Sequence, residues 1–326
     1  MKYIFFFIYF AIFFISCTAL ADKNEDFNLW LKDFKLKAKQ RGISDQTINF
    51  SLSNVKLIPR VIELDRKQPE FTLTLKQYLN RVVTKKRIEK GIKKIRENWE
   101  LLEEISTVYK VQPRFIVALW GIETDYGRIS GGFPVLDSLA TLSYDGRRRE
   151  YFTKELLNAL EIIDYGHIDS KNMMGSWAGA MGQPQFMPSS FLNYAVDFNN
   201  DGKKDIWTSR EDVLASAANY LAKLKWNNNE TWGREVLITD DFNLDPSLLT
   251  LKNEKSLLVW KKLGVKKLDG SDLPNKNLNA SLLIIQSKNN DRYFIVYKNF
   301  KRILRWNTSN FFAIAVGKLS DAISVN

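Results

Sequence analysis

A lone glutamate, Glu123, occurs among apolar residues in the segment PRFIVALWGIETDYG. It follows Trp120 by three residues, Leu119 by four and Ile116 by seven, so in a helix it shares the face of these side chains. Carboxylates are rarely buried without a partner, and no Lys or Arg stands one turn earlier. A carboxyl group in such a setting can keep its proton near neutral pH and donate it, which is the chemistry of a general acid.

The helix that must position Glu123 has recognisable ends. Pro113 suits its first turn, and Gly127 is expected to be the residue that ends it. Glu123 then lies in the last turn, where the negative end of the helix dipole disfavours an ionised carboxylate. Burial and the dipole act in the same direction, so we predict that the pKa of Glu123 is raised. The alternative is a glutamate at the rim of a core helix with its carboxylate in water.

Hydrolysis of a glycoside by the usual route needs a second carboxyl group, roughly 5 Å away or somewhat farther. Asp125 is near Glu123 in sequence, but residues two positions apart on a helix point in different directions. Asp137 follows Pro-Val-Leu and is expected to cap the start of a helix. The single histidine, His167, has no Ser or Cys motif beside it and is expected in a surface loop. The sequence therefore offers one catalytic carboxyl group and no nucleophile triad.

A second segment of interest is GSWAGAMGQPQFMPSSF, residues 175–191. Its three glycines let the main chain approach a ligand closely, and polar side chains such as Ser176 and Gln185 could orient a sugar. It lacks the lysine and the spacing of a phosphate-binding loop. The alternative is a tightly packed turn between helices.

A third segment, DFNNDGKKDIWTSRED, matches the start of a calcium loop, with candidate oxygen ligands at alternate positions. These candidates are Asp197, Asn199, Asp201 and Lys203. Gly202 stands at the sharp turn, but the twelfth position is Thr208, which cannot supply a bidentate carboxylate. Glu211 or Asp212 could close the site if the loop is longer than usual. We expect a structural calcium ion here; a turn rich in Asp and Asn is the alternative.

The first 21 residues have the pattern of a secretory signal peptide: a basic start, a short apolar run and the small-x-small site Ala-Leu-Ala. The run is shorter than the roughly 20 residues of a membrane span, and no other candidate span is evident. We predict cleavage after Ala21, which removes the only cysteine, so the mature chain has no disulfide. The segment Phe14–Cys17 also loosely matches a lipoprotein box, and the alternative is membrane association through a lipidated Cys17.

The chain carries 48 Lys and Arg residues against 37 Asp and Glu residues, and removal of the leader lowers its formal net charge from +11 to +10. A mature chain of about 300 residues exceeds one compact core, so two or three domains are expected. Excess positive charge favours polyanionic surroundings. Because we expect the chain to be exported, the acidic cell wall or an anionic membrane surface is the expected partner, and not nucleic acid.

The pattern of apolar residues changes along the chain. Residues 27–109 and 299–323 have helical spacing, and the segments described above fall within residues 111–226. Short β-strands are expected at Leu237–Ile238, Leu258–Val259, Leu282–Ile285 and Phe294–Tyr297. The expected fold class is therefore mainly α, with a small β-rich part (α+β).

Three segments together resemble the membrane-bound lytic transglycosylase B family: GIETDYGRISGGFPVLDSLATLSYDGRRREYF, GSWAGAMGQPQFMPSSFLNYAVDFNNDGKKDIW and SAANYL. The resemblance extends over residues 25–326 and is densest between residues 113 and 226. It implies a lysozyme-like helical core with an EF-hand-like loop, flanked by a helical domain and a small β domain. The implied division is a signal peptide at 1–21, a helical domain at 22–110, the core at 111–235, a β-rich insertion at 236–297 and a C-terminal helix at 298–326.

The resemblance also implies a reaction. Members of that family cleave the β-1,4 bond between N-acetylmuramic acid and N-acetylglucosamine in peptidoglycan, and they leave a 1,6-anhydromuramic end instead of adding water. Glu123 would protonate the leaving oxygen and then deprotonate the C6 hydroxyl as it attacks C1. The acetamido group of the sugar would stabilise the intermediate, so no second carboxylate is required.

The resemblance assigns substrate contacts residue by residue. These positions are Ser176, Gln185, Tyr220, Arg147, Arg148, Trp306 and Asn307. Ser176 and Gln185 match positions that hydrogen-bond the substrate, and Tyr220 matches a tyrosine that lines the cleft. The adjacent pair Arg147 and Arg148 matches a basic pair near the peptide stem, whose carboxylates suit bidentate arginine.

The last segment departs from the family pattern. Where the family commonly has Tyr-Asn followed by a second Tyr, this chain has Trp306-Asn307 and Phe312. Trp306 can still stack on a sugar, but Phe312 has no hydroxyl group to donate. For the calcium loop, the family pattern favours Asp212 over Glu211 as the closing ligand.

We therefore predict a monomeric, periplasmic lytic transglycosylase that acts on glycan strands and needs no organic cofactor. One alternative is a hydrolytic muramidase on the same fold, in which water replaces the C6 hydroxyl. The other is a non-catalytic protein that binds peptidoglycan. An acid in an apolar setting argues against a pure binder, which has no need for a carboxylate that is costly to bury.

Overall fold

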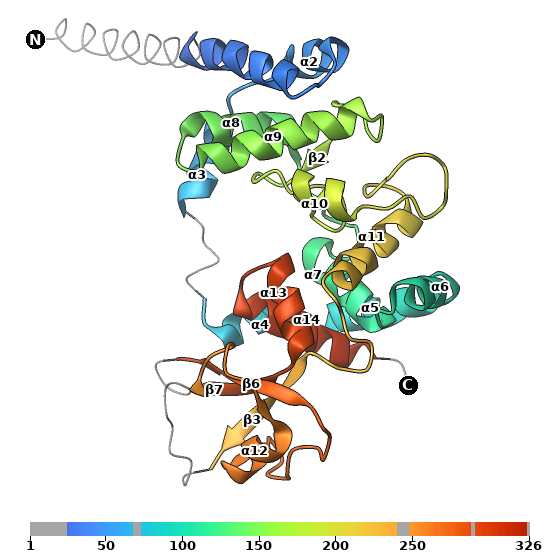
Figure 1. Cartoon of the computed structure of the whole chain (residues 1–326), viewed down its shortest axis with the longest axis vertical. Coiled ribbons are helices and arrows are strands. Elements are labelled where there is room, and N and C mark those ends of the chain that lie inside the picture. Colours follow the sequence, from blue (N-terminus) through green and yellow to red (C-terminus); the bar gives the residue numbers. More distant parts are fainter. Residues whose placement is uncertain (1–24, 68–72, 240–247, 288–290, 325–326) are drawn as a thin grey trace, which may run out of the picture. The chain divides into compact units, whose positions relative to one another are not determined.

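The computed structural model describes residues 25–67, 73–239, 248–287 and 291–324 (Figure 1). The predicted signal peptide, with Cys17, lies outside the described residues. Within the described ranges, no helix is long and apolar enough to span a membrane. The described residues divide into two compact units: unit 1 holds residues 25–67, 130–193 and 200–207, and unit 2 holds residues 73–129, 194–199, 208–239, 248–287 and 291–324. The five-part division inferred from the sequence stays a prediction.

Unit 1 is built mainly from helices. Its elements are a helix over residues 25–40, α2 (Asp45–Leu52), α3 (Pro59–Lys67), strand β1 (Phe133–Pro134), α8 (Val135–Asp145), α9 (Arg149–Asp164), strand β2 (Met174–Gly175) and α10 (Pro188–Tyr194), whose last residue belongs to unit 2. Helices α8 and α9 lie side by side (Figure 1) and bury residues such as Leu139 and Leu156. The short strands β1 and β2 pair antiparallel, with Phe133 opposite Gly175.

Unit 2 combines helices with a sheet. Its helices are α4 (Leu75–Val82), α5 (Lys85–Glu97), α6 (Trp99–Tyr109), α7 (Pro113–Thr124), α11 (Arg210–Lys223), α12 (Leu257–Lys262), α13 (Lys298–Trp306) and α14 (Asn310–Ala322). The amphipathic stretch at residues 75–110 thus forms three helices, because the Thr84 hydroxyl caps α5 and Asn98 separates α5 from α6. Helix α7 is buried over most of its length and contacts α5, α11 and α14. It is the central helix of this unit.

The sheet has five strands in the order β4-β6-β7-β3-β5, paired antiparallel. They are β3 (Gly233–Ile238), β4 (Lys255–Ser256), β5 (Val265–Lys267), β6 (Asn279–Ile285) and β7 (Arg292–Val296). Strands were predicted correctly around Leu237, Leu282 and Phe294, but Tyr297 lies just beyond β7. The strand predicted at Leu258–Val259 is wrong. These residues lie in α12, because the Ser256 hydroxyl accepts the main-chain N–H of Val259 and starts a helix that buries Trp260.

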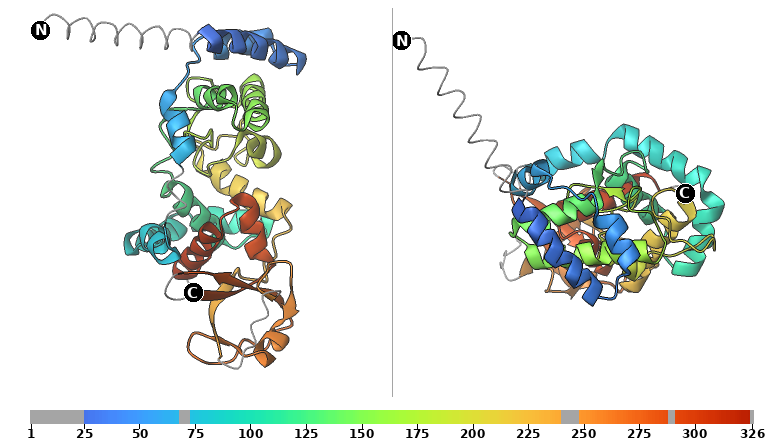
Figure 2. Two further views of the ribbon diagram at one scale, coloured as in Figure 1. Left: turned by 90° about the vertical axis from the view of Figure 1, so that its left-hand side faces the viewer. Right: turned by 90° about the horizontal axis from the view of Figure 1, so that it is seen from above.

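The two faces of the sheet pack against different elements (Figures 1 and 2). One face carries Val236, Leu282 and Ile295 and packs against Trp260 of α12 in a small apolar core. On the other face, Phe294 lies beside Trp232, whose ring in turn packs against α14. The indole N–H of Trp232 donates to Asp321 of α14 at 2.8 Å. The sheet is therefore anchored to the same helical layer that contacts α7.

Gly317 of α14 makes this anchoring testable. A Cβ atom at Gly317 would lie 2.2 Å from the ring of Trp232, which is 1% exposed and has no room to move. Gly→Ala inside a helix ordinarily stabilises by about 1 kcal/mol, but overpacking of a core costs about 1–3 kcal/mol. We expect Gly317→Ala to lower the free energy of unfolding, measured by denaturant titration. Gly132→Ala is the control, since nothing lies within 4 Å of its Cβ position; a Gly317→Ala chain at least as stable as wild type would contradict this packing.

Candidate active site

Glu123 lies in the last turn of α7 and is half-buried, as the sequence predicts. Pro113 occupies the first turn of the helix, which is also confirmed. The predicted end at Gly127 is wrong, because α7 ends at Thr124. Asp125 and Tyr126 turn the chain with left-handed φ angles of 51° and 61°. Non-glycine residues rarely adopt this conformation, so surrounding contacts must hold the turn that follows Glu123.

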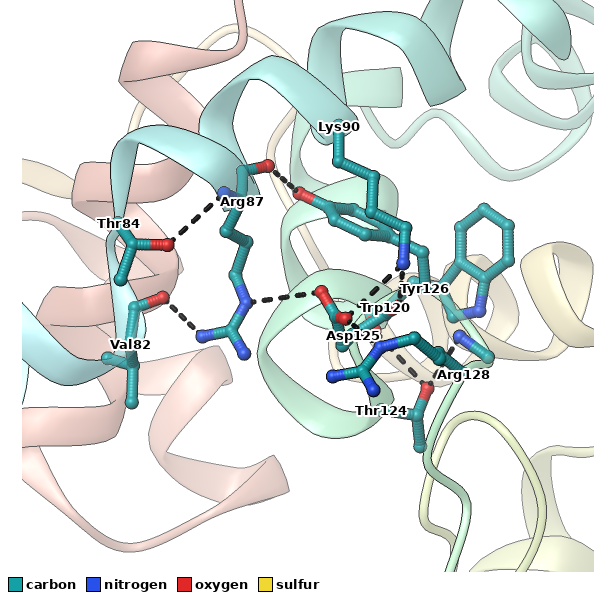
Figure 3. A network of polar contacts seen from close by, with 10 residues as sticks. Val82, Thr84, Arg87, Lys90, Trp120, Thr124, Asp125, Tyr126 and Arg128 are labelled. Atoms are coloured by element: carbon teal, nitrogen blue, oxygen red, sulfur yellow. Dashed lines mark hydrogen bonds and ion pairs between the residues drawn. The ribbon is translucent and has the colours of Figure 1, made fainter.

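Tyr126 is the first of these contacts (Figure 3). Its hydroxyl group donates to the main-chain oxygen of Arg87 at 2.7 Å, and its ring meets Trp120 edge to face at 5.7 Å. Gly91 of α5 and Gly121 of α7 make room for this side chain, since a Cβ at Gly91 would lie 2.5 Å from the hydroxyl oxygen and one at Gly121 would lie 2.7 Å from the ring. Burial raises the pKa of the Tyr126 hydroxyl, so the group stays a neutral donor.

Asp125 is the second contact and is surrounded by cations (Figure 3). Its carboxylate lies 2.5 Å from Arg128 Nε, 3.3 Å from Lys90 Nζ and 3.7 Å from Arg87 Nε. Burial alone would raise the pKa of this carboxyl, but the hydrogen bonds and charges of Arg128 and Lys90 outweigh it and leave the pKa lowered. Asp125 is therefore an ionised structural acid. This agrees with the prediction that it does not act as a second catalytic acid.

Trp306, the last residue of α13, binds the candidate acid directly. Its indole N–H donates to Glu123 Oε1 at 2.7 Å, across 183 residues of sequence. An indole nitrogen is only a donor, so Oε1 acts as the acceptor whether or not the carboxyl group is ionised. In the protonated acid, the hydrogen atom is consequently expected on Oε2.

Tyr220 of α11 supports Trp306 from the other side. The two rings lie 4.7 Å apart, and the Tyr220 hydroxyl donates to the main-chain oxygen of Arg305 at 2.7 Å. Burial and the neighbouring Tyr194 raise the pKa of Tyr220 to about 12, which keeps this donor protonated. Tyr194 lies 4.3 Å from the Tyr220 ring and extends the aromatic group. Sequence reasoning did not single out Tyr194, since an aromatic residue at the end of a short helix carries no signal of its own.

The two remaining positions of the last segment have structural contacts. Asn307 is exposed, and its side-chain oxygen accepts the main-chain N–H of Ser309 in the turn between α13 and α14. Phe312 is buried within α14. The missing hydroxyl at Phe312 is thus replaced by apolar packing, and Asn307 remains a proposed substrate contact.

Ser176 and Gln185 belong to unit 1 and lie in one tight turn, closed by a bridge between Met181 and Phe186. The Ser176 hydroxyl accepts the main-chain N–H groups of Ala178 and Ala180, which leaves its own hydrogen to be donated. Gln185 has a left-handed φ of 52° and donates its amide N–H₂ to the main-chain oxygens of Ser130 and Gly182, both at 2.9 Å. Its amide oxygen remains as an acceptor. Such strain at a polar side chain is typical of a binding site.

Arg147 and Arg148 of unit 1 both bind Asp65 of α3. Two nitrogen atoms of Arg147 contact the Asp65 carboxylate at 2.6 and 2.7 Å, and Arg148 contacts it at 2.5 Å. Asp65 is 1% exposed, whereas nearly half of each arginine side chain is exposed. Asp65 therefore holds a surface pair of guanidinium groups in a fixed orientation, and the exposed edges of both remain accessible.

Asp65→Asn is expected to lower stability at neutral pH by about 1–3 kcal/mol, because it removes a buried acceptor of charged donors. Burial alone would raise the pKa of Asp65, but its bonds and charges with both arginines leave the pKa lowered from 3.8. A lowered folded-state pKa contributes stability above about pH 4, which is lost as the pH falls through the folded-state value. The difference in melting temperature between wild type and Asp65→Asn should therefore become smaller at acidic pH. A difference in melting temperature that does not change with pH would contradict a stabilising role for the ionised Asp65 carboxylate.

The candidate calcium loop continues into α11. Asp212 is fully buried in the first turn of this helix, and its Oδ1 accepts the main-chain N–H of Phe198 at 2.7 Å. This bond ties the start of the loop, with Asp197 and Asn199, to Asp212. Asp201 and Lys203 belong to unit 1, where Asp201 Oδ1 accepts the Lys203 main-chain N–H at 2.9 Å. In the described part of the chain, no three His, Cys, Asp or Glu side chains are grouped as a metal site.

Comparison with known families gives these arrangements a context. A profile of the Transglycosylase SLT domain matches residues 26–321, nearly the whole chain. The chain belongs to this transglycosylase family. Among curated members, the membrane-bound lytic murein transglycosylase B of Escherichia coli (strain K12) is 31% identical over 298 residues, which cover 88% of this chain and 80% of that protein.

Solved structures of the transglycosylase family agree. SltB3 from Pseudomonas aeruginosa, in complex with NAG-NAM-pentapeptide, has a TM-score of 0.87 and 40% identity, covering 91% of this chain and 79% of that one. The Escherichia coli lytic transglycosylase Slt35 in complex with calcium has a TM-score of 0.76 and 30% identity, covering 92% and 93%. These findings confirm the predicted family, the lysozyme-like fold class and the assignment of the chain as a lytic transglycosylase.

Proposed function

We propose that this transglycosylase cleaves the β-1,4 bond between N-acetylmuramic acid and N-acetylglucosamine in peptidoglycan and forms a 1,6-anhydromuramic end. The observation that carries the proposal is the setting of Glu123, a half-buried carboxyl group at the end of α7 that accepts the indole N–H of Trp306. Asp125, the nearest acid in sequence, is held by Arg128 and Lys90. With Asp125 engaged in these ion pairs, Glu123 suits a mechanism in which the same residue acts first as acid and then as base.

In the first step, Oε2 of Glu123 donates its proton to the glycosidic oxygen, and the bond from that oxygen to C1 of the muramic sugar breaks. The carboxylate formed is stabilised by the Trp306 N–H on Oε1. In the second step, the carboxylate takes the proton of the C6 hydroxyl while the C6 oxygen bonds to C1. Glu123 is then protonated again and no water is consumed, so the cycle closes.

Substrate contacts are proposed for seven residues, of which four have polar groups available to a ligand. Ser176 would donate its O–H to a sugar oxygen, and Gln185 would accept from a sugar hydroxyl or amide. Arg147 and Arg148, oriented by Asp65, would bind a carboxylate of the peptide stem. The rings of Tyr220 and Trp306 and the side chain of Asn307 complete the proposed set.

A structural calcium ion is proposed for the loop that starts at Asp197. The donors there are hard oxygen atoms from carboxylates, an amide and the main chain of Lys203, the set that calcium prefers. Asp212 is proposed as the closing ligand, because its buried carboxylate already contacts the loop at Phe198. The ion would fix the geometry of the loop and take no part in the cleavage.

Removal of calcium is expected to lower the melting temperature. An ion present at 100 times its dissociation constant stabilises the folded state by about 2.7 kcal/mol, which corresponds to about 5 °C or more for a chain of this size. We expect EGTA to shift the thermal melt downward and added Ca²⁺ to restore it. The Asp201→Asn chain should respond less to EGTA than wild type. An identical melt with and without EGTA would remove the metal from this proposal.

We also propose that the mature protein acts as a monomer in the periplasm, where its substrate is found. This rests on the signal-like pattern of residues 1–21 and on the family's substrate. Either cleavage after Ala21 or lipidation at Cys17 is compatible with that location. Mass spectrometry of the mature N-terminus distinguishes the two.

The decisive experiment is mass spectrometry of the fragments released from purified peptidoglycan. Anhydromuramic ends, 18 Da lighter than reducing ends by the loss of one water, are expected. Reducing ends would replace the proposal with a hydrolytic muramidase on the same fold. Binding without any fragment release would instead identify a non-catalytic wall protein.

A further inference from the structure

A cavity of unit 2 lies at the opposite end of α7 from Glu123. It has a volume of about 330 Å³, a size typical of small-ligand pockets. Gln112 and Arg114 at the start of α7 form one wall. Glu123 lies nine residues farther along the helix than Arg114, roughly 14 Å away at 1.5 Å per residue. The cavity is therefore distinct from the group that performs the cleavage.

The charge of this cavity is positive. Three cations, Arg114, Arg234 and Lys276, line it together with one acid, Glu230. Arg114 is held in place by Asp321 at 2.8 Å and by the Thr231 hydroxyl at 3.2 Å. Of the three cations, it alone has a carboxylate partner among the described residues. Glu230 Oε2 is also buried without a hydrogen-bond partner among the described residues. The three cations still outnumber this single acid, and the excess positive charge favours an anionic ligand.

Arg234 is another cation that lines the cavity. It extends from β3, and its guanidinium group lies beside the Tyr297 hydroxyl. Burial raises the pKa of Tyr297, and the positive charge of Arg234 opposes that rise. Within the described chain, Arg234 Nε is buried without a hydrogen-bond partner. Arg234 as a whole is only partly buried, but a buried N–H group without a partner is costly, so this guanidinium group is suited to an incoming carboxylate.

The rest of the wall is apolar or carries amide groups. Leu257, Leu278 and Pro274 form an apolar side, and Asn228 and Asn229 add amide donors and acceptors. A lone phosphate or sulfate ion would leave that apolar side and most of the volume unfilled. A short peptide with small aliphatic side chains and a terminal carboxylate would contact all three kinds of wall.

We propose that this cavity is a secondary binding site for the peptide stem of peptidoglycan, with a stem carboxylate between Arg234 and Lys276. This rests on the proposed function, because it is the glycan substrate that brings stems to the enzyme. A stem held here would keep the protein on cross-linked wall material independently of the cleavage at Glu123.

Calorimetric titration of the mature protein with a synthetic stem tetrapeptide tests the site. We expect binding that weakens about tenfold when the C-terminal carboxylate is converted to the amide, the loss of one charge-assisted hydrogen bond. Arg234→Gln and Lys276→Gln should each weaken binding of the free acid by a similar factor. Lys276 is exposed, so this second variant is not expected to disturb the fold. The matched control is Lys262→Gln, an exposed lysine on α12 outside the cavity.

Unchanged affinity in both Arg234→Gln and Lys276→Gln would overturn the proposal, as would affinity for glutarate equal to that for the tetrapeptide. If the stem peptide binds at Arg147 and Arg148 instead, both cavity variants would keep the wild-type affinity. The tetrapeptide has no glycosidic bond, so its binding does not depend on Glu123. Calorimetry therefore tests the cavity, and mass spectrometry of the released fragments tests the proposed cleavage, so either proposal can fail without the other.

Discussion

Glu123→Gln is expected to leave less than about one thousandth of the wild-type rate of anhydro-product release from peptidoglycan. The amide has no acidic proton for the glycosidic oxygen, and it cannot take the proton of the C6 hydroxyl. One substitution thus removes both proton transfers from the same residue. The amide oxygen can still accept the indole N–H of Trp306, so the end of α7 and its contact with α13 should persist.

The control for this prediction is Glu104→Gln, which changes an exposed glutamate of α6 in the same unit. Both variants should melt within a few degrees of wild type, and only Glu123→Gln should lose activity. Residual activity of Glu123→Gln above about one tenth of wild type would show that another group donates the proton. Loss of activity with a large fall in melting temperature would point instead to a structural role.

Local spacing was sufficient to place Glu123 on the central helix. Pro113 starts α7 and the apolar residues recur at three and four positions, so the buried face follows from the sequence. The end of that helix did not follow, because the left-handed turn begins at Asp125 and Tyr126, before Gly127, where contacts with α5 hold it. Lys90 and Arg87 hold Asp125 and Tyr126 in conformations that these residues rarely adopt alone. Nothing within the segment itself reveals these partners.

Partners that are distant in sequence also limited the prediction of the arginine pair in unit 1. Arg147 and Arg148 were expected from the family resemblance to face the substrate, but the acid that orients them, Asp65, stands more than 80 residues earlier. The strand predicted at Leu258–Val259 failed for a local reason, since apolar runs of this length suit a helix or a strand equally well. The N-cap hydrogen bond of Ser256 stabilises the helix at this position.

Trp306→Phe is expected to lower kcat/KM by about 10- to 100-fold, because one charge-assisted hydrogen bond is worth about 1.5–3 kcal/mol. The substitution keeps an aromatic ring against Tyr220 but removes the N–H that binds Glu123 Oε1. Without this donor, the carboxyl group can rotate and its proton is no longer confined to Oε2. The effect therefore acts through Glu123, which makes Trp306 a positioning residue for the acid.

Two measurements separate positioning from simple packing. The donor favours the ionised carboxylate, so its removal should move the fall in rate on the basic side of the pH profile to higher pH. Trp306→Tyr, which supplies a hydroxyl donor in place of the indole N–H, should recover part of the activity and return the profile towards wild type. If only the packing against Tyr220 were lost, the melting temperature would fall and the pH dependence of the rate would not shift. Wild-type activity in Trp306→Phe, or equal loss in the Phe and Tyr chains with an unshifted profile, would show that the bond to Glu123 does not govern the proton transfer.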